Sequence, residues 1–197
     1  AIHPVDKEAG RSIFRRYHAD GAEPVVGISV RNWQHETRFK DVMAEVADRI
    51  VRELSARVVF LPMQFPEDVH AAESIAERTH EPCTVLKDEY TTSEFLSLVG
   101  NMDLMLAIRL HALIFAGVMG VPMIGVSYDP KIDRFLSSIG EKPVGSLDTV
   151  TADELMAEIR RKWNDKAVFR KRNAELLGKL RDLAARNAEL ALQLIER

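Results

Sequence analysis

Five short apolar segments alternate along the chain with longer segments that repeat hydrophobic residues at helical spacing. The apolar segments cover residues 24–30, 57–63, 83–87, 103–108 and 122–127. Within each of them hydrophobic residues follow one another directly, as in strands that are covered on both faces. Strands of this kind form a parallel sheet, and right-handed crossovers place helices on both of its sides. The pattern therefore predicts an α/β fold, a Rossmann-like, doubly wound parallel sheet.

The segments between the strands predict the helices that cover this sheet. Helices are expected over about residues 6–18, 37–55, 66–79, 91–99, 109–119 and 131–138. Thr91 or Thr92 suits an N-cap, and Glu94 is placed for a capping box. From about residue 150 to its end the chain has the pattern of long C-terminal helices, with a break near Asn164.

This pattern divides the chain into three parts. Residues 1–23 are expected to form a linker and an N-terminal helix, residues 24–150 the Rossmann-like domain, and residues 151–197 a C-terminal helical segment. The chain begins at Ala1 without a methionine, and its first segment has the character of a linker. We therefore expect a fragment of a longer protein.

The last helical segment carries a heptad-like seam. Its positions follow alternating spacings of four and three: Leu176, Leu180, Leu183, Asn187, Leu190 and Leu194. One interpretation is a coiled coil that makes a homodimer. The other is an amphipathic helix that packs on its own domain or on a missing half of the protein. A seam this short favours the second interpretation, and the homodimer stays open.

Composition excludes several classes of partner. The formal net charge is -3, with 27 basic and 30 acidic residues, so no overall attraction to nucleic acid is expected. No apolar run approaches the roughly 18 residues of a membrane span. Cys83 is the only cysteine, which excludes an internal disulfide and fits a reducing compartment. The expected location is the cytoplasm, either free or peripheral at the inner membrane face.

Polar residues follow the carboxyl ends of the predicted strands, where open α/β sheets bind their ligands. These residues are Arg31, Gln64, Lys87, Arg109, His111, Tyr128, Asp129 and Lys131. Several of them are cationic although the chain as a whole is negative. Their convergence on one edge predicts a site for a small, multiply charged anion.

Arg109 and His111 have the strongest context among these residues. They stand where the fourth strand passes into a helix, so the N–H groups of the first helical turn face the same place. A guanidinium also binds a carboxylate or phosphate through two parallel hydrogen bonds.

Each candidate also has a structural interpretation. Arg109 could form a surface salt bridge, and His111 could be a hydrogen-bonded structural residue. Asp129, followed by proline, could simply cap the next helix, which is the favoured interpretation of that residue on its own. Tyr128 could be a packed aromatic residue. Trp33 could stack on a sugar or cover the sheet edge, with no preference between the two.

The motifs of other ligand sites do not occur. The glycines form neither G-x-G-x-x-G nor a P-loop, and no G-x-S-x-G nucleophile elbow is present. The histidines and the single cysteine have no metal-ligand spacing, so no metal is expected.

Three segments resemble a known family. "RLHALIFAGVMGVPMIGVSYDPKI", "VVGISVRNW" and "FLPMQFPEDVHAAESI" are similar, in order and spacing, to the C-terminal half of bacterial polysaccharide pyruvyltransferases of the CsaB type. The resemblance covers about residues 24–140. It implies the C-terminal domain of a GT-B-like fold, in which phosphoenolpyruvate binds as donor substrate without a further cofactor.

The resemblance also implies a reaction and its residues. Pyruvyl transfer to a sugar would form a 4,6-ketal during cell-wall polysaccharide biosynthesis. The acceptor would be a lipid-linked saccharide containing N-acetylmannosamine, and the polymer would anchor S-layer proteins. Arg31, Arg109 and His111 would hold phosphoenolpyruvate, with Leu110 contributing its backbone. The missing N-terminal half would carry the acceptor site, so activity of this chain alone stays open.

The chemistry suggests a role for each residue. Arg31 and Arg109 suit the carboxylate and phosphate, and His111 is a phosphate donor or the proton source for the substrate's C3. Tyr128 and Lys131 are further substrate-binding candidates, and Asp129 is a further catalytic candidate. Arg109→Ala is expected to abolish phosphoenolpyruvate binding without unfolding the domain.

Two other classes of function remain open. The first is a GT-B-like glycosyltransferase or epimerase that binds a nucleotide-sugar. The second is a non-catalytic anion-binding or dimerising module. Against the first class, the turn from Ile108 to His111 lacks the glycine that commonly faces a diphosphate.

Overall fold

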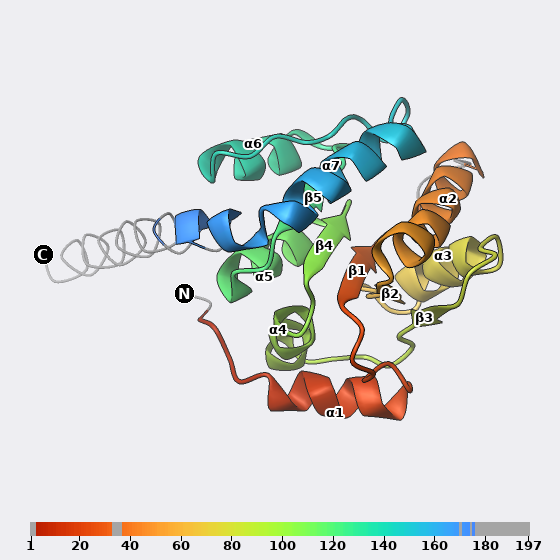
Figure 1. Ribbon diagram of the computed structural model, residues 1–197, viewed down its shortest axis with the longest axis vertical. Helices are drawn as coiled ribbons and strands as arrows, with labels where there is room; N and C mark the ends of the chain where they lie inside the picture. Colours follow the sequence, from red (N-terminus) through yellow and green to blue (C-terminus); the bar gives the residue numbers. More distant parts are fainter. Residues whose placement is uncertain (1–2, 33–36, 170, 174, 176–197) are drawn as a thin grey trace, which may run out of the picture.

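The computed structural model describes residues 3–32, 37–169, 171–173 and 175 (Figure 1). Its centre is a parallel five-stranded sheet in the order β3-β2-β1-β4-β5. The strands are β1 (Val25–Ser29), β2 (Arg57–Phe60), β3 (Cys83–Val85), β4 (Leu104–Ala107) and β5 (Met123–Gly125). All four strand pairs are parallel. The structure therefore confirms the Rossmann-like α/β fold.

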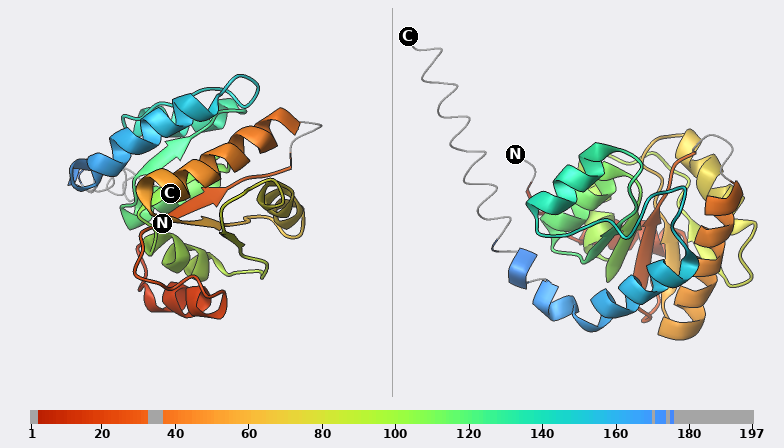
Figure 2. Two further views of the ribbon diagram at one scale, coloured as in Figure 1. Left: turned by 45° about the vertical axis from the view of Figure 1, so that its right-hand side comes forward. Right: turned by 90° about the horizontal axis from the view of Figure 1, so that it is seen from above.

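Seven helices surround the sheet within the described part of the chain. They are α1 (Glu8–Arg16), α2 (Thr37–Leu54), α3 (Glu67–Ala76), α4 (Thr92–Gly100), α5 (Leu110–Met119), α6 (Pro130–Ser138) and α7 (Ala152–Asn164). Helices α2, α3 and α7 share one hydrophobic core, and α1, α4, α5 and α6 share the other. Figure 2 shows the two groups on opposite faces of the sheet.

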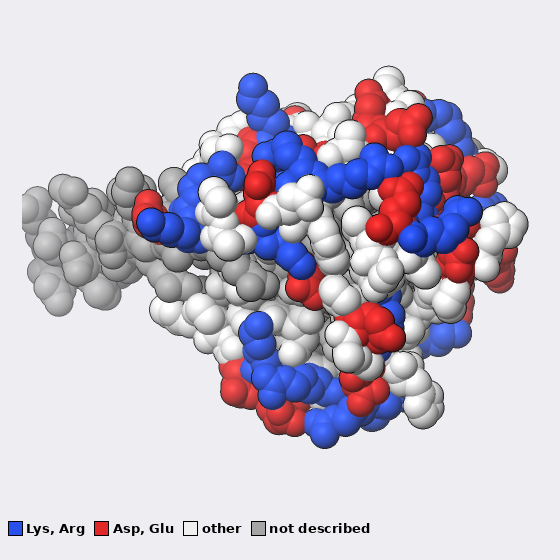
Figure 3. Space-filling view, viewed as in Figure 1, with Lys and Arg blue, Asp and Glu red and all other residues white. Residues whose placement is uncertain are grey.

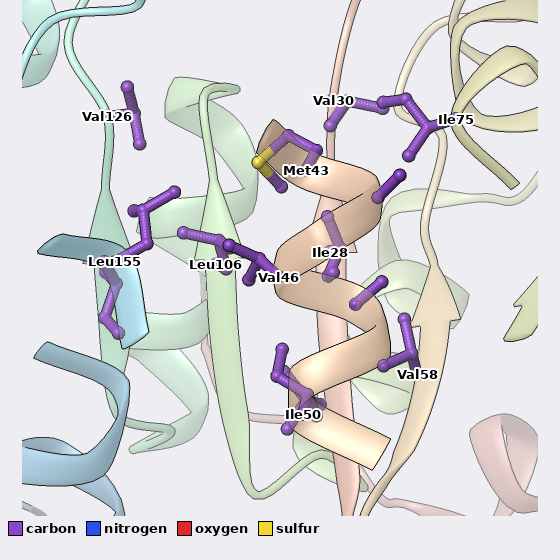
Figure 4. Close-up of a cluster of buried hydrophobic side chains, with 14 of the residues drawn as sticks. Ile28, Val30, Met43, Val46, Ile50, Val58, Ile75, Leu106, Val126 and Leu155 are labelled. Atoms are coloured by element: carbon purple, nitrogen blue, oxygen red, sulfur yellow. The ribbon is translucent and has the colours of Figure 1, made fainter. Parts of the chain in front are cut away.

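The larger core lies between α2 and the sheet. Met43, Val46 and Ile50 follow one another at helical spacing and are almost fully buried. Figure 4 shows them pointing toward Ile28 of β1 and Leu106 of β4. Consecutive apolar residues in these central strands are needed because each strand faces helices on both sides.

The second strand is shorter than its apolar run. The prediction placed it over residues 57–63, but β2 ends at Phe60. Pro62, which has no N–H group, interrupts the ladder as the sequence suggested, and the Met63 and Gln64 N–H groups beyond it donate to the carboxylate of Asp68 at 3.1 and 2.9 Å. Because these N–H groups bind a side chain, the backbone turns toward α3 instead of continuing the sheet.

The predicted capping box is present. The Thr91 hydroxyl accepts from the Glu94 N–H at 3.3 Å, and the Glu94 carboxylate accepts from the Thr91 N–H at 2.8 Å. The predicted break near Asn164 coincides with the end of α7. The heptad-like seam over residues 176–194 lies outside the described residues.

A buried ion pair joins α7 to the sheet. Lys162 of α7 donates to the carbonyl oxygen of Met123 at 2.5 Å and lies 2.7 Å from the Glu141 carboxylate. The Lys162 and Glu141 side chains are only 4% and 6% exposed. Burial favours the neutral amine and lowers the pKa of Lys162 to about 8, although the neighbouring Glu158 carboxylate favours the ammonium form.

Candidate anion-binding site

The parallel register places the carboxyl ends of β1, β2, β4 and β5 on one edge of the sheet (Figure 1). Strands β1 and β4 are neighbours there, but the helices that follow them, α2 and α5, cover opposite faces. This is a topological switch point, the place where open α/β sheets form a crevice for ligands. Arg31 and Arg109 each follow one of these two strands by two residues.

Arg109 is held firmly at this point. It is the N-cap residue of α5, with an extended backbone, and its side chain is 15% exposed. Its Nε donates to Asp68 Oδ2 at 2.9 Å, and its Nη2 donates to Asp68 Oδ1 and, at 3.1 Å, to Gln64 Oε1. Its Nη1 has no hydrogen-bond partner among the described residues, so these N–H groups remain to bind a ligand.

Asp68 is a positioning residue that sequence reasoning missed. Its side chain is fully buried, and it accepts from the Met63 and Gln64 N–H groups as well as from Arg109. A sequence signal for it exists: Asp68 stands four and seven residues before Ala72 and Ile75, on the apolar face of α3. A carboxylate on such a face needs a buried partner.

Arg31 and Tyr128 come together from β1 and the end of β5. The Arg31 Nη1 donates to the Tyr128 hydroxyl at 2.8 Å, and the guanidinium carbon lies 5.1 Å from the ring centroid. The tyrosine ring also packs against both hydrophobic cores. Tyr128 is therefore a packed aromatic residue whose hydroxyl orients Arg31, and a direct contact with substrate stays a prediction.

Leu110 and His111 are the first two residues of α5. Their N–H groups have no carbonyl partner within the helix, and the helix dipole adds partial positive charge at this end. His111 is exposed, and its ring lies 6.4 Å from that of Phe115, measured between centroids. The described structure therefore leaves the His111 imidazole accessible to a ligand.

Asp129 and Lys131 occupy the start of α6. The Asp129 carboxylate accepts from the Lys131 N–H at 2.9 Å, with Pro130 in the first helical turn. This backbone hydrogen bond lowers the pKa of Asp129, so the carboxylate is ionised at neutral pH. Lys131 is largely exposed, and its Nζ lies 3.5 Å from Asp129. The geometry favours the capping interpretation of Asp129, and its catalytic role stays a prediction.

The strand-end residues do not all take part in one group. Gln64 joins Arg109, as described above. Lys87, in contrast, bonds to Glu73 of α3 at 2.6 Å, and this hydrogen bond raises the pKa of Lys87. Trp33, whose role in sugar stacking was left open, lies outside the described residues.

Charge on the visible surface is mixed. Figure 3 shows Lys and Arg side chains interspersed with Asp and Glu over the face that carries α6 and α7. Among the residues that the structure describes, no group of His, Cys, Asp or Glu side chains is arranged to hold a metal ion. Within the same residues, no helix is long and apolar enough to cross a membrane.

The fold and the switch-point site define the class of protein: a Rossmann-like domain of the type found in GT-B enzymes. E. coli ADP-heptose lps heptosyltransferase II has a TM-score of 0.67 at 15% identity, over 83% of this chain and 53% of that chain. The S. aureus MnaA–UDP co-structure has a TM-score of 0.65 at 10% identity, over 86% of this chain and 44% of that chain. This chain therefore spans about half the length of these two proteins.

A third similar structure is a single domain. The C-terminal domain of a group 1 family glycosyl transferase (LpcC) from Francisella tularensis has a TM-score of 0.63 at 9% identity, over 90% of this chain and 94% of that chain. At these identities the likeness shows the fold alone.

No curated protein sequence matches. A model of the polysaccharide pyruvyl transferase family matches residues 6–130, and the chain belongs to this family.

Proposed function

We propose that this chain is the donor-binding domain of a polysaccharide pyruvyltransferase and that phosphoenolpyruvate binds at the switch point between β1 and β4. The observation that carries the proposal is the pairing of Arg109 with Asp68. This pair fixes the Arg109 guanidinium at the carboxyl edge of the sheet, while the Arg109 backbone caps α5 directly before Leu110 and His111. A pre-oriented guanidinium and free helical N–H groups together suit a carboxylate and a phosphate on one small molecule.

Group transfer would proceed in two steps. The oxygen of one sugar hydroxyl bonds to C2 of phosphoenolpyruvate, and a proton adds to C3, which becomes a methyl group. The oxygen of a second hydroxyl then bonds to C2 as the bond from C2 to the phosphate oxygen breaks. One hydroxyl proton balances the proton gained at C3, and the other leaves with inorganic phosphate. The product is a pyruvate ketal, a 4,6-ketal if the hydroxyls are O4 and O6.

The described residues fit different parts of this reaction. Arg109 and the first N–H groups of α5 bind the phosphate, whose charge grows as it departs. Arg31, oriented by Tyr128, binds the carboxylate. His111 is accessible enough to donate a proton to C3 or a hydrogen bond to the phosphate. Lys131 adds positive charge at the rim of the phosphoenolpyruvate site. The acceptor is a saccharide with two suitably placed hydroxyls, for which lipid-linked N-acetylmannosamine is our expectation.

A nucleotide-sugar enzyme is the second candidate, because structures with the same fold include a UDP-GlcNAc 2-epimerase and an ADP-heptose heptosyltransferase. The turn between β4 and α5 argues against it. Its residues, Arg109 among them, include no glycine, whereas dinucleotide-binding turns of this kind of sheet use glycines where the backbone meets a diphosphate.

Calorimetric titration separates the two candidates. We expect phosphoenolpyruvate to bind this chain and UDP and UDP-N-acetylglucosamine not to bind at the same concentrations. The phosphoenolpyruvate affinity should fall with added salt, because the contacts are between charges. Binding of the uridine ligands without phosphoenolpyruvate would overturn the proposal in favour of a nucleotide-sugar enzyme.

A further inference from the structure

A concavity opens beside the Arg109 group at the same sheet edge. It encloses about 190 Å³ between the segment after β2 and the segment after β3. Met63 and Phe65 line it on one side, and they flank Gln64, whose side chain accepts from Arg109. The concavity is therefore one residue away from the proposed donor site along the chain, but neither Gln64 nor Arg109 lines it.

Aromatic side chains form much of the lining. The Phe65 side chain is 49% exposed, unusual for a large apolar residue in this structure. Tyr90 and Phe95 meet edge to face with centroids 5.6 Å apart, and Phe95 lies 6.4 Å from Phe115. Phe115 in turn packs beside His111. A continuous row of rings thus connects this concavity to His111.

Carboxylates complete the rim. Glu89 is exposed and has no hydrogen-bond or ion-pair partner among the described residues. Asp88 lies 3.5 Å from Arg16, with both side chains more than half exposed, so this contact holds it weakly. Two carboxylates can therefore accept hydrogen bonds from a ligand that covers the aromatic rings.

We infer that this concavity binds one ring of the saccharide acceptor. A pyranose has apolar C–H faces and a rim of hydroxyl donors, which match the exposed Phe65 ring and the Glu89 and Asp88 carboxylates. Exposed apolar surface bordered by polar groups is typical of a ligand site. This inference rests on the proposed function and adds to the expectation that the missing N-terminal half carries the acceptor site: one acceptor ring lies on this chain, on the side of Arg109 and His111 from which its hydroxyls must meet C2 of the donor.

A quaternary ammonium ion is the competing ligand, because aromatic rings and carboxylates also bind cations. The saccharide is favoured for two reasons. The rings of Tyr90 and Phe95 pack edge to face on each other instead of forming a box of parallel walls. The concavity also adjoins an anion site whose proposed reaction needs hydroxyl groups.

A saccharide titration tests the inference. The probe is the methyl glycoside of N-acetylmannosamine, with free 4- and 6-hydroxyls, followed by saturation-transfer NMR on this chain at millimolar concentrations. We expect Phe65→Ala to weaken its binding about tenfold and Phe65→Tyr, which keeps the ring, to retain it. Glu89→Gln should also weaken binding. Val168→Ala, at an exposed apolar residue outside the concavity, is the control and should change nothing.

The outcomes separate this inference from the proposed function. Unchanged glycoside binding in Phe65→Ala, or no glycoside signal in the unmodified chain, overturns the subsite. Binding of choline in place of the glycoside overturns it in favour of a cation site. Phosphoenolpyruvate is titrated into the same samples, and Phe65→Ala should bind it normally. Glycoside binding that depends on Phe65, together with no phosphoenolpyruvate binding, would support the subsite and contradict the proposed donor.

Discussion

Arg109→Ala is expected to lower phosphoenolpyruvate affinity by about a hundredfold or more, because it removes the paired donor of the anion site. It should also lower the free energy of unfolding by about 3–5 kcal/mol, since Asp68 is then fully buried without its cation. Sequence reasoning expected the loss of binding without unfolding. The structure keeps the expected loss of binding but adds an expected loss of stability.

The double variant Asp68→Ala/Arg109→Ala separates folding from binding. With both charges removed, no buried ion remains unpaired, so part of the lost stability should return; the remainder reflects the Met63 and Gln64 N–H groups, which lose their acceptor. Phosphoenolpyruvate binding should stay lost. Urea unfolding and calorimetry on the two single variants and the double variant measure both quantities. Recovery of binding in the double variant would show that Arg109 acts only through stability and does not touch the ligand.

Lys162→Met is expected to destabilise the domain by about 3–5 kcal/mol. The methionine removes the ammonium group and leaves the Glu141 carboxylate buried, with only the half-exposed Arg172 guanidinium beside it. A second change, Glu141→Leu, should restore most of the loss because the pair is then replaced by apolar groups. Urea unfolding of the single and double variants measures the coupling. Additive effects would contradict a direct interaction between the two side chains.

Lys162 should also make stability depend on pH. Burial lowers its pKa to about 8 in the folded protein from the ordinary 10.5 in the unfolded chain. Between these values the unfolded chain holds a proton that the folded chain has released, so the free energy of unfolding rises with pH across this window. Below pH 8 the contribution is constant. The rise should be absent from Lys162→Met, and its persistence there would assign it to another group.

Much of the fold follows from local sequence signals. Uninterrupted apolar runs predicted strands covered on both faces, and the spacing of Thr91 and Glu94 predicted a capping box. Both features depend on residues that are close together in the sequence. The same holds for Asp129, where a carboxylate before a proline suggested a helix cap. Strand ends were less accurate, as the early end of β2 shows. Beyond Pro62 the N–H groups of Met63 and Gln64 bind Asp68 instead of a neighbouring strand, an interaction invisible in the hydrophobic pattern.

The site was predicted in position but not in its contacts. Parallel strands must end at one edge, so Arg31 and Arg109 could be placed there from the sequence. The partner of Arg109 could not, because Asp68 stands 41 residues earlier and meets it only in the folded sheet, where β1 lies between β2 and β4. Lys87 was expected at the same site, but a closer carboxylate on α3 holds it elsewhere. Which carboxylate a cationic side chain contacts depends on distances that only the folded structure sets.

Amide and guanidinium shift mapping by ¹⁵N NMR tests the central claim most directly. Phosphoenolpyruvate should shift the backbone amides of Leu110 and His111 and the Nε–H signals of Arg31 and Arg109. Another concavity, of about 430 Å³, contains Arg11, Arg15 and Arg57 together with four carboxylates, and its arginines serve as an internal control for nonspecific anion binding to exposed guanidinium groups. Shifts confined to the first group are the predicted result. Shifts confined to the second group, or no shifts at all, would contradict a phosphoenolpyruvate site at the switch point.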